Sequence, residues 1–289
     1  MRTKTGSPPE EVAALATPTP ADPPDAPLAE ALLQEPRRRQ VPAGVYYLAS
    51  VVVGIGIWWI AAVAGTNELL PTPGAVARAG WDGLRDGDLL TQTWASLRRV
   101  LIGFLLGVAV AVPTGFLMGW YRWANSALEP WVQFFRTIPP LALIPLVIIF
   151  LGVGESAKIS LIFLAAYLSC VIAVVQGVRN VDRVLLNAAR VLGAKDRHLF
   201  VKVVVPASLP YLFVGMRVAL GNAWATLVAA ELIAADTGLG HMMKTAGTYF
   251  EVPTVIVGVI VIGILGMLMD RVVLYLDRRL TRWQDKSES

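Results

Sequence analysis

Three charged side chains interrupt stretches of the sequence that are otherwise apolar, and they have the clearest potential for chemistry. Arg136 opens the third apolar segment, whereas Arg217 and Glu231 lie within the fifth. A charge at the centre of a membrane helix costs about 2.5–3.5 kcal/mol on insertion scales, so it needs a partner, water or a solute. A guanidinium in such a position has the chemistry to bind an anion.

Structural roles compete with this interpretation. Arg217 and Glu231 can each pair with an opposite charge on a neighbouring helix, and Arg136 can extend its long side chain to the membrane interface. Trp224 can equally well pack against other helices. If these residues line a path for a solute, we expect the path to be formed by Arg136, Pro139, Pro140, Arg217, Trp224 and Glu231.

A basic, amphipathic stretch over residues 182–206 separates two long apolar runs. Its apolar residues recur at three- and four-residue spacing, which predicts one helix face, formed by Val184, Leu185, Ala188, Ala189 and Leu192. Asp182 is a suitable N-cap, and Gly193 is suited to end the helix because glycine tolerates the left-handed conformation. We expect a second short helix through Leu199 to Pro206. The pattern alone fits a surface in water or a helix on lipid headgroups.

No combination of residues in the sequence predicts catalysis. The sequence has no glycine-rich loop with Gly-Lys-Ser/Thr, so we expect no ATP hydrolysis by this chain. His198 and His241 lie far apart without acidic residues or cysteines at ligand spacing, so we expect no metal and no bound cofactor. Cys170, the single cysteine, lies in an apolar run and is expected to be a packing residue.

The composition predicts a membrane protein. Hydrophobic residues make up 55% of the 289 residues and charged residues 16%, against about 25% charged residues in soluble domains. The net charge of +4 does not indicate nucleic-acid binding, because the basic residues gather at the ends of apolar runs, as at membrane interfaces. A membrane helix needs about 20 apolar residues. We therefore predict an all-α, polytopic bundle with six spans, over residues 41–64, 100–121, 131–151, 159–178, 210–231 and 252–271.

Prolines predict local features of this bundle. The third span contains Pro139, Pro140 and Pro145, so we expect a broken helix there. Between the first two spans, residues 70–74 read Leu-Pro-Thr-Pro-Gly and predict a rigid turn, followed by an amphipathic helix over residues 76–90.

The distribution of Lys and Arg predicts the orientation in the membrane. Residues 1–40 are rich in proline and have no apolar core of the signal-peptide type, so we expect a disordered cytoplasmic tail. Arg37 to Arg39, the basic stretch and the C-terminal end favour a cytoplasmic location for both termini. Arg98 and Arg99 are the main exception, because this orientation places them outside.

The basic stretch resembles a known family motif. Asn187-Ala188-Ala189, Gly193 after three further residues, and residues 203–206 (Val-Val-Val-Pro) after nine more are similar to the EAA loop of binding-protein-dependent ABC importer permeases. In that family the loop is a coupling helix that docks on the ATPase subunit. Asn187 replaces the motif's glutamate, although its amide can still form hydrogen bonds. The resemblance implies ATPase contacts at Asn187, Ala188, Ala189, Leu192, Gly193, Ala194, Leu199, Phe200 and Pro206.

Further stretches are similar to the permeases of taurine, aliphatic sulfonate and nitrate/bicarbonate importers. They are Leu70–Pro73, Arg136–Leu146, Leu151–Lys158, Leu227–Ala235 and Thr237–Gly240, and the similarity covers about residues 45–285. It implies a type I ABC importer fold of the MetI-like kind in the plasma membrane. It also implies a second permease copy, expected to form a homodimer in the lipid bilayer, two ATPase subunits that carry ATP and Mg²⁺, and an extracytoplasmic solute-binding protein.

The resemblance implies alternating access driven by the partner ATPase. Its first implied solute is a sulfonate such as taurine, with nitrate, bicarbonate or another small solute as alternatives. An ion-coupled secondary transporter is less favoured, because we find no internal repeat and Glu231 is the only acidic candidate in the core spans. A membrane scaffold without transport would leave the EAA-like loop unexplained.

Overall fold

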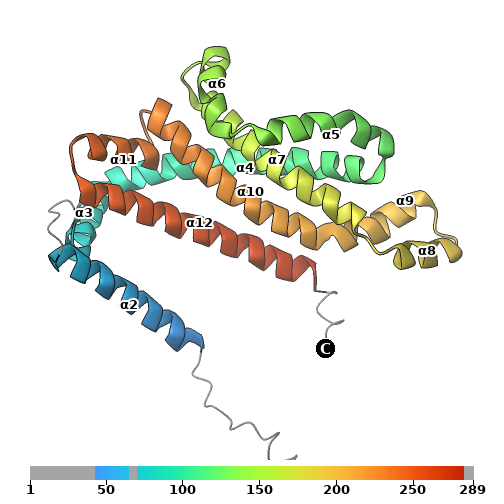
Figure 1. Ribbon diagram of the computed structural model, residues 1–289, viewed down its shortest axis with the longest axis horizontal. Coiled ribbons are helices and arrows are strands. Elements are labelled where there is room, and N and C mark those ends of the chain that lie inside the picture. Colours follow the sequence, from blue (N-terminus) through green and yellow to red (C-terminus); the bar gives the residue numbers. More distant parts are fainter. Residues whose placement is uncertain (1–42, 65–69, 283–289) are drawn as a thin grey trace, which may run out of the picture. The chain divides into compact units, whose positions relative to one another are not determined.

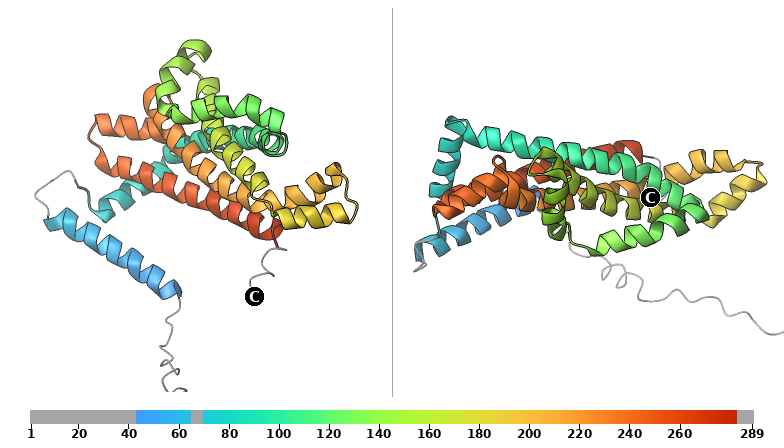
Figure 2. Two further views of the ribbon diagram at one scale, coloured as in Figure 1. Left: turned by 45° about the vertical axis from the view of Figure 1, so that its right-hand side comes forward. Right: turned by 90° about the horizontal axis from the view of Figure 1, so that it is seen from above.

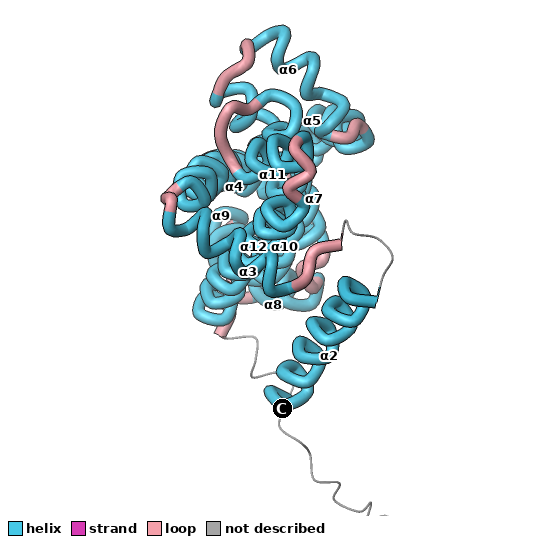
Figure 3. The backbone as a smooth tube through the Cα atoms, turned by 90° about the vertical axis from the view of Figure 1, so that its left-hand side faces the viewer, coloured by secondary structure: helices cyan, strands magenta, loops and turns pink. Residues whose placement is uncertain are grey.

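The computed structural model describes residues 43–64 and 70–282 of the chain. Within those residues every regular element is a helix, and no strand occurs (Figures 1 and 3). The chain divides into two units, Met1–Gly54 and Ile55–Ser289, and the arrangement below concerns the second. The tail predicted over residues 1–40 lies outside the described residues.

Five helical stretches of the described chain are long and apolar enough to cross a membrane. They are α2 (Ala43–Ala64), α4 (Asp88–Trp120), α7 (Glu155–Arg179), the stretch Asp196–Ala234 that ends in α10 (Val205–Ala234), and α12 (Val252–Leu280). A sixth arises if α5 (Arg122–Thr137) and the pair η1 (Pro140–Leu143) and α6 (Ile144–Leu151) count as one span bent by 91°. The all-helical prediction is confirmed, and six predicted spans agree with this count.

The bend lies at the prolines of the third predicted span. Helix α5 ends at Thr137, Pro139 precedes η1, and α6 starts at Ile144 with a proline in its first turn. Proline removes a backbone donor and fixes φ, which suits the first turn of a new helix better than the interior of an old one. The chain therefore changes direction at residues 138–140.

The two helices that follow α2 differ from their predicted bounds. The amphipathic helix expected over residues 76–90 is α3 (Pro73–Arg85), with Thr72 as N-cap. A turn at Gly87, whose φ is 78°, separates it from α4, which begins at Asp88 rather than at Val100. Hydropathy marks only the apolar part of a span, so the polar first turns of α4 were not predicted.

Helix α7 lies at the centre of the bundle between α4 and α10, and small residues allow the close approach. A Cβ atom placed on Gly107 of α4 would lie 2.7 Å from the Cβ of Ala166 and 2.9 Å from the carbonyl oxygen of Phe163. Gly115 stands in the same relation to Val174. Close backbone packing through small residues is typical of helices in membranes, and it fixes α4, α7 and α10 as one packed group.

Four short helices of the described chain lie at the two ends of this group. Helices α8 (Arg183–Val191) and α9 (Asp196–Leu199) follow α7 at one end, and α3 and α11 (Leu239–Thr248) lie at the other (Figures 1 and 2). Helix α10 runs between the two ends and lies beside α12. A displacement at the α8 end can therefore reach the α11 end through one helix.

Candidate functional site

Local hydrogen bonds define the beginning and end of α8. The Oδ1 atom of Asp182 accepts a hydrogen bond from the amide of Val184 at 2.8 Å. At the other end Gly193 has a φ of 81°, and its amide donates to the carbonyl of Arg190 at 2.9 Å. The amide of Ala194 donates to the carbonyl of Ala189 at 3.0 Å. These two bonds form a Schellman motif, which requires a left-handed residue at the position of Gly193.

The second helix of the loop continues into the membrane segment instead of ending at Pro206. Helix α9 passes into a π-helical turn (Phe200–Val204) and then into α10, so Asp196–Ala234 forms one helical stretch. The π turn directly precedes Pro206, which has no amide hydrogen to donate to the carbonyl of Lys202. The proline is thus accommodated by a wider turn, and the loop is joined to α10 without a break.

Aromatic contacts attach this turn to α4. The ring of Phe200 lies edge-on to Phe116 at 5.8 Å and tilted against Trp120 at 5.5 Å between centroids. Leu199 and Val204 are fully buried beside it. Of the residues with predicted ATPase contacts, Leu199 and Phe200 therefore position the loop, whereas Asn187, Ala188, Leu192 and Gly193 are exposed.

Helix α8 presents an apolar face that nothing in the described chain covers. The side chains of Val184, Val191 and Leu192 are 72%, 88% and 87% exposed. Arg183 and Arg190 are exposed on the same helix, while Leu186 packs against the core. An exposed apolar patch with a charged rim is typical of a protein contact surface.

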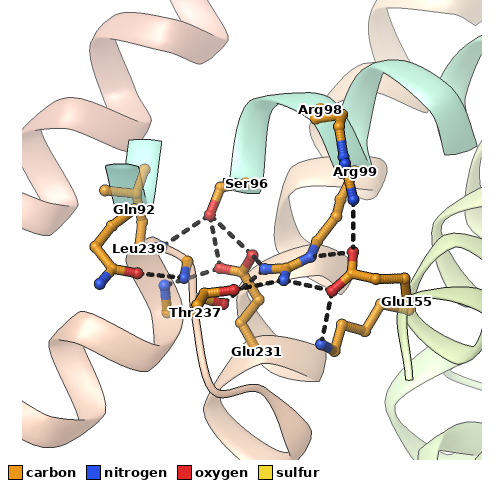
Figure 4. Close-up of polar contacts among 11 residues, drawn as sticks. Gln92, Ser96, Arg98, Arg99, Glu155, Glu231, Thr237 and Leu239 are labelled. Carbon is orange, nitrogen blue, oxygen red and sulfur yellow. Dashed lines mark hydrogen bonds and ion pairs between the residues drawn. The ribbon is translucent and has the colours of Figure 1, made fainter. Parts of the chain in front are cut away.

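A buried ion-pair network occupies the α11 end of the bundle (Figure 4). Arg99 of α4 is 2% exposed and Glu231 of α10 is fully buried. Nη1 of Arg99 lies 2.6 Å from Oε1 of Glu231, and Nη2 lies 2.6 Å from Oε1 of Glu155. Nη1 also donates to the carbonyl of Thr237 at 2.6 Å. One guanidinium thus joins α4, α7, α10 and the turn before α11.

Glu231 also accepts hydrogen bonds from two uncharged groups. The hydroxyl of Ser96 donates to the carboxylate at 2.8 Å, and the amide of Gly240 donates to it at 2.9 Å. Ser96 in turn accepts from the amide of Leu239 at 2.8 Å (Figure 4). The structure therefore places Glu231 in a buried polar network that spans several helices. Arg99 was not predicted as the partner of Glu231. The sequence did contain a signal, because the predicted orientation places Arg99 on the side of the membrane where arginine is disfavoured.

Arg217 also faces a carboxylate. Its Nε lies 2.6 Å from Oδ1 of Asp270 on α12, and its Nη2 donates to Oδ2 at 3.2 Å. Trp224 is 5% exposed, and a Cβ atom on Gly266 of α12 would lie 3.8 Å from its ring. Arg217, Trp224 and Glu231 are spaced seven residues apart, so they share one face of α10, which is turned toward neighbouring helices.

A cavity of about 460 Å³ lies beside the break between α5 and η1, against α7 and α10. Its polar residues include Arg136, Ser169 and Asn222, and the Nδ2 of Asn222 donates to the Oγ of Ser169 at 2.8 Å. Arg136 and Pro140 were predicted as path residues, but Ser169 and Asn222 were not, because single neutral polar residues in a span carry little signal. The cavity is lined by Arg136, Ile138, Pro140, Leu141, Ala165, Leu168, Ser169, Ile172, Val218, Asn222, Ala225 and Thr226.

The predicted path residues are therefore not gathered at one place. Arg136 and Pro140 line the cavity, whereas Pro139, Arg217, Trp224 and Glu231 do not. The α10 residues that line it include Val218, Asn222 and Ala225, at spacings of four and three. Val218 and Ala225 each follow a residue of the other face, Arg217 and Trp224, by one position, so this face is rotated by about 100° from the face that carries Arg217.

The sequence matches the model of one protein family over residues 103–282, which contain α8, α9 and the helices around the cavity. That family is described as the binding-protein-dependent transport system inner membrane component. The chain belongs to this family. It is a multi-pass membrane protein and an ABC transporter permease, as the resemblance of its EAA-like loop implied.

Named relatives confirm the subfamily. A probable ABC transporter permease protein of Brucella abortus (strain 2308) is 57% identical over 240 residues, which cover 83% of this chain and 96% of the relative. The taurine transport system permease protein TauC of Escherichia coli (strain K12) is 36% identical over 255 residues, covering 86% and 92%. Relatives named for aliphatic sulfonates and for bicarbonate also match.

The fold has a solved counterpart. A chain of the MetNI methionine ABC transporter, described in inward-facing conformations, matches with a TM-score of 0.53 over 66% of this chain and 93% of that chain. At 20% identity the likeness concerns the fold alone. It confirms the expected MetI-like arrangement of helices.

Proposed function

We propose that this permease is the membrane subunit of an importer that moves a small organic anion across the plasma membrane by alternating access, driven by a partner ATPase. A sulfonate such as taurine is the first candidate, because taurine and aliphatic sulfonate permeases are among the relatives. The bicarbonate relative keeps inorganic anions as the second candidate. The observation that carries the proposal is the exposed apolar face of α8.

The apolar face of α8 is suited to dock on the ATPase. Docking would cover Val191 and Leu192, which are 88% and 87% exposed in the chain, and would place Asn187 at the contact. The orientation that we propose puts α8, α9 and both termini in the cytoplasm, where ATP and Mg²⁺ bind the ATPase. Arg183, Arg190 and Lys195 near the contact agree with the excess of positive charge on that side.

Helix α10 provides the mechanical link between this contact and the solute. Asn222 of the cavity wall follows Phe200 by 22 residues, which is about 33 Å along a helix with a rise of 1.5 Å. The π turn connects α9 to α10 without a flexible linker. When ATP draws two ATPase subunits together, the loops of two permease copies would move with them, and α10 would carry that motion to the cavity. Alternating access of this kind requires only that the bundle has two stable conformations and that ATP shifts the equilibrium between them.

The test replaces Gly193, which forms the turn between α8 and α9. Gly193→Val puts a β-branched side chain at a φ of 81°, a conformation that such residues rarely adopt. We expect co-purification of the ATPase and solute-stimulated ATP hydrolysis to fall together, by tenfold or so. A matched control is Gly152→Val, because Gly152 has a φ of 77° and free space around it but follows α6.

The two variants give distinct outcomes. Gly152→Val is expected to be at least as strained, because Gly152 combines its positive φ with a ψ of 175°, a region almost restricted to glycine. We nevertheless expect it to capture the ATPase at the wild-type level. Normal capture by Gly193→Val, with Gly152→Val also normal, would remove the assignment of α8 as the docking element.

A further inference from the structure

We propose that the cavity beside the helix break is a binding subsite for an organic anion with a short aliphatic segment. Arg136 would attract the anionic group, and the Ser169–Asn222 pair would hydrogen-bond a polar group of the same molecule. The inference rests on the proposed function and narrows its solute class, because a bare inorganic anion would use only part of the site.

The guanidinium of Arg136 is available to bind an anion. None of the ion pairs among the described residues includes Arg136, whereas Arg99 and Arg217 each lie 2.6 Å from a carboxylate oxygen. Arg136 also lines a second, smaller cavity of about 120 Å³, which Arg179 and Gln176 line as well. An uncommitted guanidinium between two cavities offers an anion two to three charge-assisted hydrogen bonds.

The Ser169–Asn222 pair retains hydrogen-bonding groups that a solute could use. Ser169 uses its hydroxyl hydrogen on the carbonyl of Ala165 at 2.9 Å and accepts from Asn222 at 2.8 Å. Asn222 therefore keeps one amide hydrogen and its carbonyl oxygen, since a primary amide has two donors and one acceptor group. It can serve an oxygen of the anion or a donor such as an ammonium or hydroxyl group.

Most of the other residues that line the cavity are apolar. Leu168 and Ile172 of α7 and Val218 and Ala225 of α10 lie at helical spacing around the polar pair. A cavity of about 460 Å³ falls in the range of small-molecule sites, which combine apolar walls with a few polar groups. Methylene groups of a solute would be removed from water here, so an alkyl sulfonate or carboxylate suits the site better than bicarbonate.

The experiment measures charge selectivity inside the cavity by thiol labelling of the purified permease–ATPase complex. Cys170 is fully buried and is the only cysteine, so Cys170→Ala gives a suitable background. Asn222→Cys is then labelled with anionic 2-sulfonatoethyl methanethiosulfonate and with its cationic trimethylammonio counterpart. We expect Arg136→Gln to lower the ratio of the anionic to the cationic rate about tenfold, as for a charge that focuses ions in a cleft.

A second readout separates the two solute classes. Butane-1-sulfonate should slow the labelling of Asn222→Cys, whereas sodium bicarbonate at the same concentration should not. Asp236→Cys serves as the matched control, because residue 236 is exposed in the turn after α10 and lines none of the cavity. Its rate ratio should be the same with and without the Arg136→Gln substitution.

Two results would overturn the subsite. One is a rate ratio at residue 222 that does not respond to Arg136→Gln, and the other is equal protection by butane-1-sulfonate and bicarbonate. Ser169→Cys repeats the measurement from α7 if Asn222→Cys does not assemble, and no labelling at either position also refutes the proposal. Labelling requires no ATP hydrolysis, and ATPase capture is scored separately, so a failed subsite leaves the importer proposal standing.

Discussion

At the scale of single residues, the buried Arg99 and the exposed Arg136 differ in their partners. Arg99 has carboxylates on two sides, and Glu231 accepts hydrogen bonds from three groups, which are the hydroxyl of Ser96, the guanidinium of Arg99 and the amide of Gly240. Arg136 has no ion pair among the described residues. Paired charges such as these hold helices together, whereas the binding role that we propose for Arg136 requires a guanidinium without a carboxylate partner.

Removing one member of the buried network should therefore destabilise the bundle strongly. Glu231→Gln leaves Arg99 with an uncompensated charge on that side, and breaking a buried pair costs about 3–5 kcal/mol. We expect a clear drop in the thermal unfolding temperature of the purified protein, with part of it recovered by adding Arg99→Met. Arg98→Gln is the control, because Arg98 pairs with Glu155 only at 3.6 Å and is 55% exposed. Additive losses in the double variant would show that the two residues do not act as a pair.

At the scale of elements, the features that could be predicted from the sequence depend on neighbours in the chain. Asp182 and Gly193 mark the ends of α8 through bonds to residues two to five positions away. The break in the third span follows from Pro139 and Pro140 in the same way. Such local signals do not depend on how helices pack, so they can be read without the tertiary structure.

The rotation of α10 could not be predicted in this way. Arg217, Trp224 and Glu231 lie on one face, and Asn222 lies on another. Which face meets the cavity depends on the close approach of α7, where a Cβ atom on Gly215 would lie 2.4 Å from the Cβ of Ala173. A helix that is apolar on most sides gives no periodic signal for such a contact, so the partner residues Arg99 and Asp270 were also missed.

The packing of α4 on α7 provides a test at this scale. Gly107→Ala places a Cβ atom 2.7 Å from the Cβ of Ala166, and overpacking of this kind costs about 1–3 kcal/mol. We expect a lower unfolding temperature for this variant. Gly263→Ala in α12 is the matched control, since a Cβ atom there meets nothing within 4 Å, and alanine favours a helix over glycine by up to about 1 kcal/mol. Equal stability of the two variants would contradict the close packing of α4 and α7.

At the scale of the whole second unit, α10 connects three places with different tasks. The π turn that leads into it is attached to α4 through Phe200, its middle lines the cavity with Asn222, and its far end holds Glu231 against Arg99. Contacts with α4 at both ends favour movement of this helix together with α4 and α7 rather than bending within it. We therefore expect ATP-driven opening to be a rigid-body motion of the packed group, begun at α8.

The proposed contact at α8 can be tested on the unmodified chain by hydrogen–deuterium exchange. The permease is compared with and without its ATPase, and peptides over residues 183–199 are followed beside peptides over residues 239–248 in α11. Since nothing in the described chain covers the outer face of α8, we expect binding of the ATPase to slow exchange at residues 183–199 severalfold and to leave α11 unchanged. Unchanged exchange at residues 183–199 in a complex that has captured the ATPase would contradict the coupling role of this loop.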